Sequence, residues 1–281
     1  MPESGIPVPG VNDPLTGILA ERMGFSAIYF FGAAFSASLG IPDIGLFSMD
    51  QLIDSVKWIT RSTTLPLIVD IDTGFGEAVN VVRVTKELEY LGVAAVQIED
   101  QVSPKRCGHL DGKQIVSDAH FVEKLEAALS ARQDMLVIAR TDSRDVYSFD
   151  EAVRRASLYR DAGADAIFPE ALENMEEFRQ FAVEIDAPLL ANMTEFGKSP
   201  LLSVKELGSL GYNLVIFPAT GQRVALGAVK KVFQEIVDTG SQIGWVSDMM
   251  DRLEIYDLID YEKFAELDSK IAPQITKKSV F

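Results

Sequence analysis

Short apolar runs recur along the whole chain, with room for a helix between most of them. Each run is three to five residues long, is rich in β-branched or aromatic residues, and several follow Gly or Pro. Buried parallel strands have this character because both of their faces are covered. The eight runs are Ile6–Val8, Ala27–Phe30, Leu67–Asp70, Ala94–Ile98, Leu136–Ala139, Ala166–Phe168, Pro188–Ala191 and Leu214–Phe217.

The segments between the runs carry helical periodicity. Apolar residues recur every three or four positions, as on the buried face of a helix, and three helices should end at Gly24, Gly92 and Gly163. Strands that alternate with helices, without a long linker, predict an α/β fold of the (β/α)8 TIM-barrel type. A doubly wound open sheet is the alternative.

Beyond about Thr239 the pattern changes. Apolar residues between Trp245 and Tyr261 form a helical tail after the barrel should have closed. We therefore expect a single barrel domain over residues 1–281, with 240–281 as a C-terminal helical arm. The arm either packs against its own barrel or contacts another subunit, because large exposed apolar patches are unusual on monomers.

Charge and composition exclude several classes of protein. The 281 residues include 42 acidic and 26 basic side chains, a formal net charge of −16, which argues against a nucleic-acid partner. No run approaches the ~18 apolar residues of a membrane helix, so we expect no membrane partner. A single cysteine excludes an internal disulfide, and the first residues lack a secretory signal. The sequence therefore predicts a cytoplasmic protein.

Polar residues follow nearly every apolar run. TIM-barrel enzymes carry their chemistry at the C-terminal ends of the strands, so this asymmetry favours an enzyme over an inert barrel. The residues in question are Gly32-Ala33, Asp70-Ile71-Asp72, Glu99-Asp100, Arg140-Thr141-Asp142, Glu170, Asn192-Met193-Thr194, and Arg223 after Pro218.

Two aspartates end the third run. Asp70 and Asp72 are two residues apart, so both side chains should point the same way, and Glu99 and Asp100 end the next strand. Clustered carboxylates are hard oxygen ligands of the kind that Mg²⁺ prefers. The alternative is that Asp72 only caps the backbone of a local turn.

The loop from Gln101 to Gln114 contains the only cysteine of the chain, in the segment Lys105–His109. Three potentially cationic neighbours predict that the pKa of the Cys107 thiol is lowered toward neutrality. The Pro and Gly residues of this loop suggest a lid that can move. The alternative is an exposed thiol within a solvated basic cluster.

Positive charge is scarce in this chain but gathers at the predicted site. Lys105, Arg106, Arg140 and Arg223 all follow strands or lie in the loop, which suggests a small, multiply anionic substrate. The alternative is that the arginines pair with the acids at the mouth of the barrel.

These motifs resemble the isocitrate lyase/phosphoenolpyruvate mutase superfamily. Within it, they are similar to the lyases that act on 2-methylisocitrate, and the cysteine motif is specific to the carbon–carbon lyases. The resemblance covers nearly all the chain and is carried by Val69–Gly76, Ile98–Gln101, Lys105–His109, Ala139–Asp142, Phe168–Ala171 and Leu190–Gly197.

The resemblance implies a reaction and an assembly. The reaction is retro-aldol cleavage of 2-methylisocitrate into pyruvate and succinate, in the methylcitrate cycle of propionate catabolism, with Mg²⁺ as cofactor and Mn²⁺ as a possible substitute. The assembly is a homotetramer of barrels that exchange their eighth helices, which would account for the apolar arm.

The resemblance also implies roles for individual residues. Asp70 and Asp72 would hold the metal, supported by Asp43 and Glu99. Cys107 would be the general acid within a catalytic group that includes Tyr29, a candidate base, Lys105 and His109. Substrate contacts would come from Phe31, Gly32, Ala33, Cys107, Gly108, Arg140, Glu170, Asn192, Thr194, Arg223 and Arg252.

Two departures from the usual pattern leave alternatives open. Phe31 stands where the family usually has serine, and the segment before the first strand is short. We expect Phe31 to face the site, although it could turn into the barrel wall. A lyase acting on 2,3-dimethylmalate or isocitrate is the nearest alternative, and an oxaloacetate decarboxylase or a phosphonate enzyme is a more distant one. A non-catalytic barrel that binds a dicarboxylate is the alternative from another class.

Overall fold

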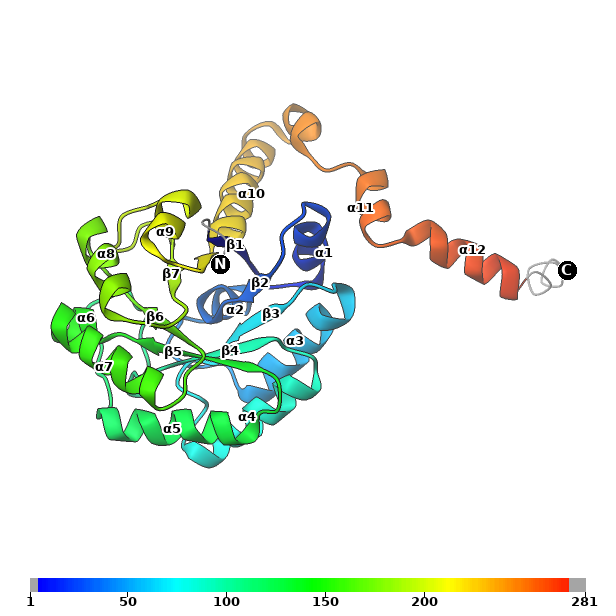
Figure 1. Ribbon diagram of the computed structural model, residues 1–281. Helices are drawn as coiled ribbons and strands as arrows, with labels where there is room; N and C mark the ends of the chain where they lie inside the picture. The colour runs from blue at the N-terminus through cyan, green and yellow to red at the C-terminus, as the bar shows by residue number, and fades with distance from the viewer. Residues whose placement is uncertain (1–4, 273–281) are drawn as a thin grey trace, which may run out of the picture. The chain divides into compact units, whose positions relative to one another are not determined.

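The computed structural model describes residues 5–272, and within this range eight parallel strands form a nearly closed barrel (Figure 1). Their order is β6-β5-β4-β3-β2-β1-β8-β7, and the Ile167–Leu189 bridge joins β6 to the segment before β7. The strands are β1 (Ile6–Val11), β2 (Ile28–Phe30), β3 (Leu67–Asp70), β4 (Ala95–Glu99), β5 (Leu136–Thr141), β6 (Ala166–Pro169), β7 (Leu190–Asn192) and β8 (Leu214–Phe217). The predicted barrel is confirmed, and the open sheet is excluded.

Helices alternate with these strands and cover their outer side (Figure 1). Apolar residues of the outward strand faces pack against them in one large buried cluster. The helices of this layer are α1 (Pro14–Arg22), α2 (Gly32–Ser38), α3 (Met49–Ser62), α4 (Ala78–Tyr90), α5 (Asp118–Ala131), α6 (Ser143–Val146), α7 (Phe149–Asp161), α8 (Met175–Glu184) and α9 (Val204–Leu210). Helix α10 (Thr220–Thr239) follows β8 and has no buried residue.

Side chains fill the interior of the barrel, so it is a packed core and not a pore. Every strand contributes to this second cluster, and Tyr29 is its largest member, with no exposed surface. The other members are Val8, Ile68, Ala95, Ile138, Ala166, Phe168, Leu190 and Ile216. The packed interior forms a floor on which the C-terminal ends of the strands can hold a site.

Glycines end three helices as expected. Gly24, Gly92 and Gly163 have φ values of +85°, +82° and +105°, and each follows the residue that caps its helix. This left-handed conformation costs glycine little because it has no Cβ.

The chain divides into two compact units, one up to Val224 and one from Ala225. The second contains most of α10, a 3₁₀ turn (Ile243–Asp248), α11 (Arg252–Leu258) and α12 (Tyr261–Ile271). Many of its apolar side chains are exposed, including Phe233, Leu253 and Phe264. The predicted helical arm is thus present. No helix among the described residues is both long and apolar enough to cross a membrane.

Candidate active site

A cavity of about 210 Å³ lies among the loops that follow the C-terminal ends of the strands. Most of the residues predicted from the sequence meet here. Those that line it are Phe31, Ala33, Asp43, Lys105, Cys107, Gly108, His109, Arg140, Glu170, Asn192, Thr194 and Arg223. A larger, open hollow lies near the opposite ends of β4 and β5, and none of the predicted site residues lines it.

Asp70 and Asp72 converge at the end of β3, as predicted, although a turn and not strand alternation brings them together. Asp72 has a left-handed φ of +49°, and its backbone N–H donates to Asp70 Oδ1 at 3.0 Å. Gly32 is close to both, since a Cβ there would lie 3.0 Å from Asp72 Oδ1 and 3.2 Å from Asp70 Oδ2. Asp72 therefore forms a local turn, and the same turn brings its carboxylate close to that of Asp70.

Lys105 reaches into this acidic cluster. Its ammonium forms an ion pair with Asp43 and lies 3.0 Å from Asp72 Oδ1, and its side chain is buried. Glu99 turns instead toward Arg140, with Oε2 3.4 Å from Nε. In the described part of the chain, no three Asp, Glu, His or Cys side chains converge as a ready-made metal site, and these pairings explain why.

The acidic residues nevertheless fit a divalent cation. Glu99 Oε1 is buried without a hydrogen-bond donor, and among residues 5–272 Lys105 is the only cation on Asp72 Oδ1. Burial raises the pKa of Asp70, and it raises that of Asp72 to about 7 in spite of Lys105. Buried carboxylate oxygens whose negative charge Lys105 and Arg140 balance only in part are suitable donors to Mg²⁺ or Mn²⁺.

Asp100 does not belong to this oxygen set, contrary to the expectation for two acids ending one strand. It accepts hydrogen bonds from Thr141 Oγ1 at 2.8 Å, from the Asp142 backbone at 2.9 Å and from Tyr159 Oη at 2.8 Å. Adjacent strand residues point to opposite faces, so Asp100 anchors the outer side of the site.

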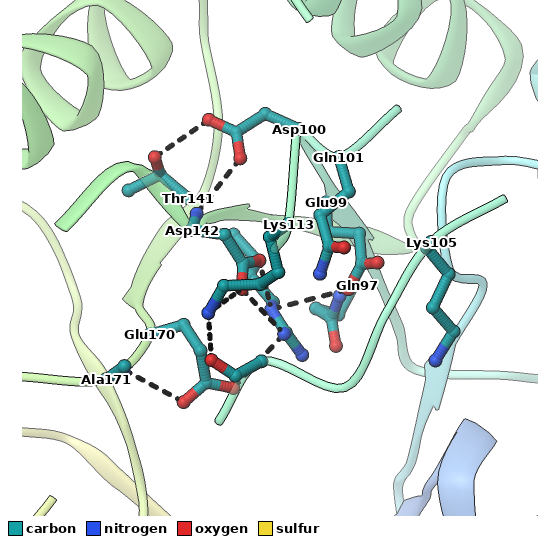
Figure 2. Close-up of polar contacts among 12 residues, drawn as sticks. Gln97, Glu99, Asp100, Gln101, Lys105, Lys113, Thr141, Asp142, Glu170 and Ala171 are labelled. Carbon is teal, nitrogen blue, oxygen red and sulfur yellow. Dashed lines mark hydrogen bonds and ion pairs between the residues drawn. The ribbon is translucent and has the colours of Figure 1, made fainter. Parts of the chain in front are cut away.

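Arg140 is surrounded by three carboxylates. Its guanidinium donates to Asp142 at 2.9 Å and lies 3.4 Å from Glu99 and 3.3 Å from Glu170. Figure 2 shows Lys113 and Glu170 on one side of Glu99 and Lys105 on the opposite side. The alternative in which arginines pair with the barrel-mouth acids therefore holds for Arg140.

Glu170 forms part of the cavity wall beside Arg140. Asn192 Nδ2 donates to it at 3.2 Å, the Ala171 backbone donates at 3.0 Å, and His109 Nε2 lies 3.1 Å from Oε1. Burial raises the pKa of Glu170, but Arg140 and His109 outweigh burial and hold it well below its usual value. Glu170 is therefore a fixed negative charge.

The three cationic neighbours of Cys107 are all engaged elsewhere. Lys105 faces the aspartates, and the Arg106 guanidinium donates to the Asp111 carbonyl at 3.3 Å. His109 Nδ1 accepts the backbone N–H of Lys198 at 3.0 Å, and its Nε2 lies 3.1 Å from Glu170 Oε1.

Burial consequently raises the pKa of the Cys107 thiol, and the nearby Glu170 and Asp43 raise it further. The predicted lowering was wrong, because the cations that precede and follow the cysteine in sequence do not surround it in space. A thiol with a raised pKa is protonated at neutral pH.

Gly108 is packed against the charged wall. A Cβ at this position would overlap Arg140 Nη2 and would lie 2.5 Å from Glu170 Cγ. Only glycine therefore lets the backbone next to Cys107 approach these two side chains.

Phe31 precedes α2, lines the cavity and also packs against the Tyr29 ring of the barrel interior, with ring centroids 6.1 Å apart. Arg223 donates to Thr194 Oγ1 at 3.0 Å and to Glu195 at 2.7 Å. Arg252 lies in the second unit, at the start of α11, and its approach to the site stays a prediction.

Tyr29 lies fully buried in the barrel interior. Its hydroxyl donates to Gln97 Oε1 at 2.6 Å, and burial raises its pKa well above the usual value. Tyr29 is thus a protonated donor in this arrangement, and its role as a base stays a prediction.

Two lysines of the site were not identified from the sequence. Lys113 is fully buried and donates to the Gly108 carbonyl, and Lys198 contacts Asp111 and Asp145. Nothing in the sequence marks them, because lysines in polar loops are normally solvated.

Comparisons with known proteins agree with this geometry. Residues 3–237 match the family model described as phosphoenolpyruvate phosphomutase. A 2-methylisocitrate lyase from Aeropyrum pernix is 51% identical over 264 residues, 94% of this chain and 86% of that protein.

Solved structures extend the similarity to the fold. A crystal structure of 2,3-dimethylmalate lyase has a TM-score of 0.91 and 34% identity, covering 100% of this chain and 95% of that one. Phosphonopyruvate hydrolase in complex with oxalate and Mg²⁺ has a TM-score of 0.86 and 31% identity, covering 95% and 94%. The chain therefore belongs to the phosphoenolpyruvate phosphomutase family and is similar along nearly its whole length to the 2-methylisocitrate lyases.

Proposed function

We propose that this protein is a carbon–carbon lyase that cleaves 2-methylisocitrate into pyruvate and succinate, the reaction that its relatives' names imply for them. One observation supports this reaction above all. The cavity is lined by a protonated thiol, Cys107, by Arg140, Glu170 and Asn192, and by Asp43 and Lys105, the lysine that also pairs with Asp72. Retro-aldol cleavage needs these elements: charge compensation, hydroxyl activation and a proton donor.

Arg140 and Arg223 bind and orient the anionic substrate. Both line the cavity, and arginine pairs well with carboxylates. The substrate carries three carboxylates, and cleavage places a further negative charge beside one of them. Arg140, Arg223 and Lys105 compensate that charge from fixed positions, which is the most effective form of electrostatic catalysis.

Cys107 delivers the proton to the succinate carbanion. The thiol lines the cavity and starts the reaction protonated, because burial raises its pKa. Gly108 presents its backbone beside Arg140 and Glu170, and His109 holds Glu170 from the same loop. Tyr29 is the candidate base, but its hydroxyl is protonated and donates to Gln97 Oε1, so it would have to lose that proton before it could remove the hydroxyl proton of the substrate.

Asp70 and Asp72, supported by Asp43 and Glu99, would hold Mg²⁺, with Mn²⁺ as a substitute. A bound cation of this kind polarises a hydroxyl and an emerging ketoacid carbonyl. The buried Glu99 Oε1, which has no hydrogen-bond donor, and the raised pKa of Asp72 support this assignment.

Further parts of the proposal concern the whole chain. The protein acts in the cytoplasm as a homotetramer that exchanges its eighth helix, α10. Residues 240–281, of which 273–281 lie outside the described residues, belong to the arm of a single barrel domain. The exposed apolar side chains of α10 support the exchange. Arg252 would then reach an active site from the arm.

A 2,3-dimethylmalate lyase is the second candidate. The structural similarity to that enzyme and the Phe31 ring in the cavity favour it, since dimethylmalate has fewer carboxylates and more apolar surface than 2-methylisocitrate. Isocitrate, which lacks the methyl group, is the third substrate to compare.

The deciding experiment measures the 2-oxo acid released from each of the three substrates, trapped as its phenylhydrazone. We expect 2-methylisocitrate to give the highest kcat/KM. Release of oxo acid from 2,3-dimethylmalate alone would replace the proposed substrate. No release from any of them, with dicarboxylate binding intact in calorimetry, would identify a binding barrel and overturn the proposal.

The same assay tests the metal. Activity should vanish in chelated buffer and return with Mg²⁺ or Mn²⁺, and Asp72→Asn should weaken Mn²⁺ binding measured by calorimetry. Its melting temperature should change little, because Asp72 lies beyond the end of β3 and outside the apolar core. Asp54→Asn, at an exposed position of α3, is the matched control. Full activity in chelated buffer would contradict the metal assignment.

A further inference from the structure

A chain of ion pairs joins three of the loops around the cavity. Lys198, in the loop after β7, lies 2.6 Å from Asp111 Oδ1 in the Cys107 loop and also pairs with Asp145 in α6. One ammonium therefore links the loops that follow β4, β5 and β7. We call Lys198, Asp111, Asp145 and Lys113 the clasp.

The clasp continues inward to the backbone beside the thiol. Lys113 Nζ lies 3.1 Å from Asp145 Oδ2 and 3.3 Å from Asp142 Oδ1, and it donates to the Gly108 carbonyl. The Lys113 side chain has no exposed surface and Asp145 is 11% exposed, so salt screens this inner part of the clasp only weakly.

The backbone of the same loop fixes His109. The Lys198 N–H donates to His109 Nδ1 at 3.0 Å, and a Cβ on Gly197 would lie 2.7 Å from that nitrogen. The loop after β7 thus rests directly on the Cys107 loop, and the Lys198 side chain spans the junction.

We propose that Lys198 is a positioning residue that holds the Cys107 loop closed over the cavity. It acts through Asp111, Asp145 and Lys113, and it does not touch the reacting atoms. Closure itself can be measured without substrate. Only its link to catalysis rests on the proposed function.

The two ion pairs of Lys198 should contribute unequally. Asp111 is 95% exposed, and exposed pairs contribute little because water and salt screen them. Asp145 is nearly buried and also holds Lys113, so its pair with Lys198 should carry most of the effect. Loss of Asp145 should therefore open the loop more than loss of Asp111.

Cys107, the only cysteine, reports directly on loop opening. A dye-linked maleimide is too bulky for the cavity, so its rate of reaction follows the open population when opening is fast. Lys198→Met should be labelled about tenfold faster than the parent, and Lys198→Arg within about twofold of it. Lys205→Met, at an exposed position of α9, should label at the parental rate.

Salt gives a second signature. Raising the salt to 1 M, where the Debye length is about 3 Å, should speed labelling of the parent, whose outer pair is exposed, more than that of Lys198→Met. Asp111→Asn should label about twofold faster than the parent, and Asp145→Asn faster still. Asp111→Asn keeps the test available if a variant at a buried position fails to fold.

Parental labelling of folded Lys198→Met, or equal acceleration in Lys205→Met, would overturn the clasp. Oxo-acid release should fall about tenfold in kcat for Lys198→Met, with a smaller change in KM. If the parent cleaves none of the three substrates while the labelling series behaves as expected, the clasp stands and the proposed function fails. If the parent turns over normally while labelling is the same in every variant, the proposed function stands and the clasp fails.

Discussion

Cys107, the only cysteine of the chain, is the proposed proton donor. Cys107→Ser should fold and bind product but lose about 10²–10⁴-fold in turnover, the usual contribution of a general acid, because a serine hydroxyl is far less acidic. Oxo-acid release by the purified variant measures this loss. Turnover within about threefold of the parent, a barrier difference below ~1 kcal/mol, would show that the thiol is only a loop residue.

We also predict that Phe31 determines the preference between 2-methylisocitrate and isocitrate. Its ring lines the cavity, where it can pack on the methyl group of 2-methylisocitrate, and a buried CH₂ is worth about 0.8 kcal/mol. In Phe31→Ser the ratio of kcat/KM for 2-methylisocitrate over isocitrate should therefore fall about fourfold. An unchanged ratio would mean that Phe31 plays no part in selectivity.

The residue types at the strand ends could be read from the sequence, but their pairings could not. Lys105 pairs with Asp43, 62 positions away, and His109 with the Lys198 backbone, 89 positions away. A pKa depends on the groups that are close in space and on burial. The charges near Cys107 in sequence therefore gave the wrong direction for its pKa.

At the scale of elements, the eight strands follow the eight apolar runs closely, because strands buried on both faces are apolar at every position. The seventh strand shows where the apolar run and the observed strand differ. The run begins at Pro188, whereas β7 begins at Leu190. The Pro188 carbonyl accepts the Ile167 N–H at 2.9 Å, so the two residues before β7 join β6 through a single bridge and lie outside the regular strand.

Helix α7 offers a prediction on pH. Glu151, in its first turn, accepts from Arg154 at 2.8 Å and from Arg155 at 2.9 Å. The hydrogen bond from Arg154, followed by that from Arg155, outweighs burial and lowers the pKa of Glu151 from 4.5 to about 2. A lowered pKa stabilises the fold above the ordinary pKa, and this stability is lost as the pH falls from about 4.5 toward 2.

Glu151→Gln should therefore lower the free energy of unfolding at pH 7 by about 1 kcal/mol, a value discounted for solvent screening. The difference from the parent should shrink as the pH falls to 3, measured by urea unfolding. Glu126→Gln, at an exposed position of α5, is the control. A difference that stays constant between pH 7 and 3 would rule out an ionised Glu151 as its source.

At the scale of the whole molecule, α10 carries an apolar face that the chain leaves exposed. Phe233 is 63% exposed, and Val229 and Ile236 are each 41% exposed. If subunits exchange this helix, Phe233→Asp should place a charge in the interface and reduce the mass seen in sedimentation from tetramer toward monomer. Lys230→Asp, on the same helix, is the control for the added negative charge. A parent that sediments as a monomer would contradict the assembly.

The half-buried, protonated state of Cys107 has a consequence for its reactivity toward oxidants. Peroxide and disulfides react with the thiolate and hardly at all with the thiol. An enzyme that depends on one sulfur atom would lose activity quickly if that sulfur were ionised. Partial burial of Cys107 and the acids beside it raise its pKa, so we expect peroxide to oxidise this sulfur only slowly in the resting protein.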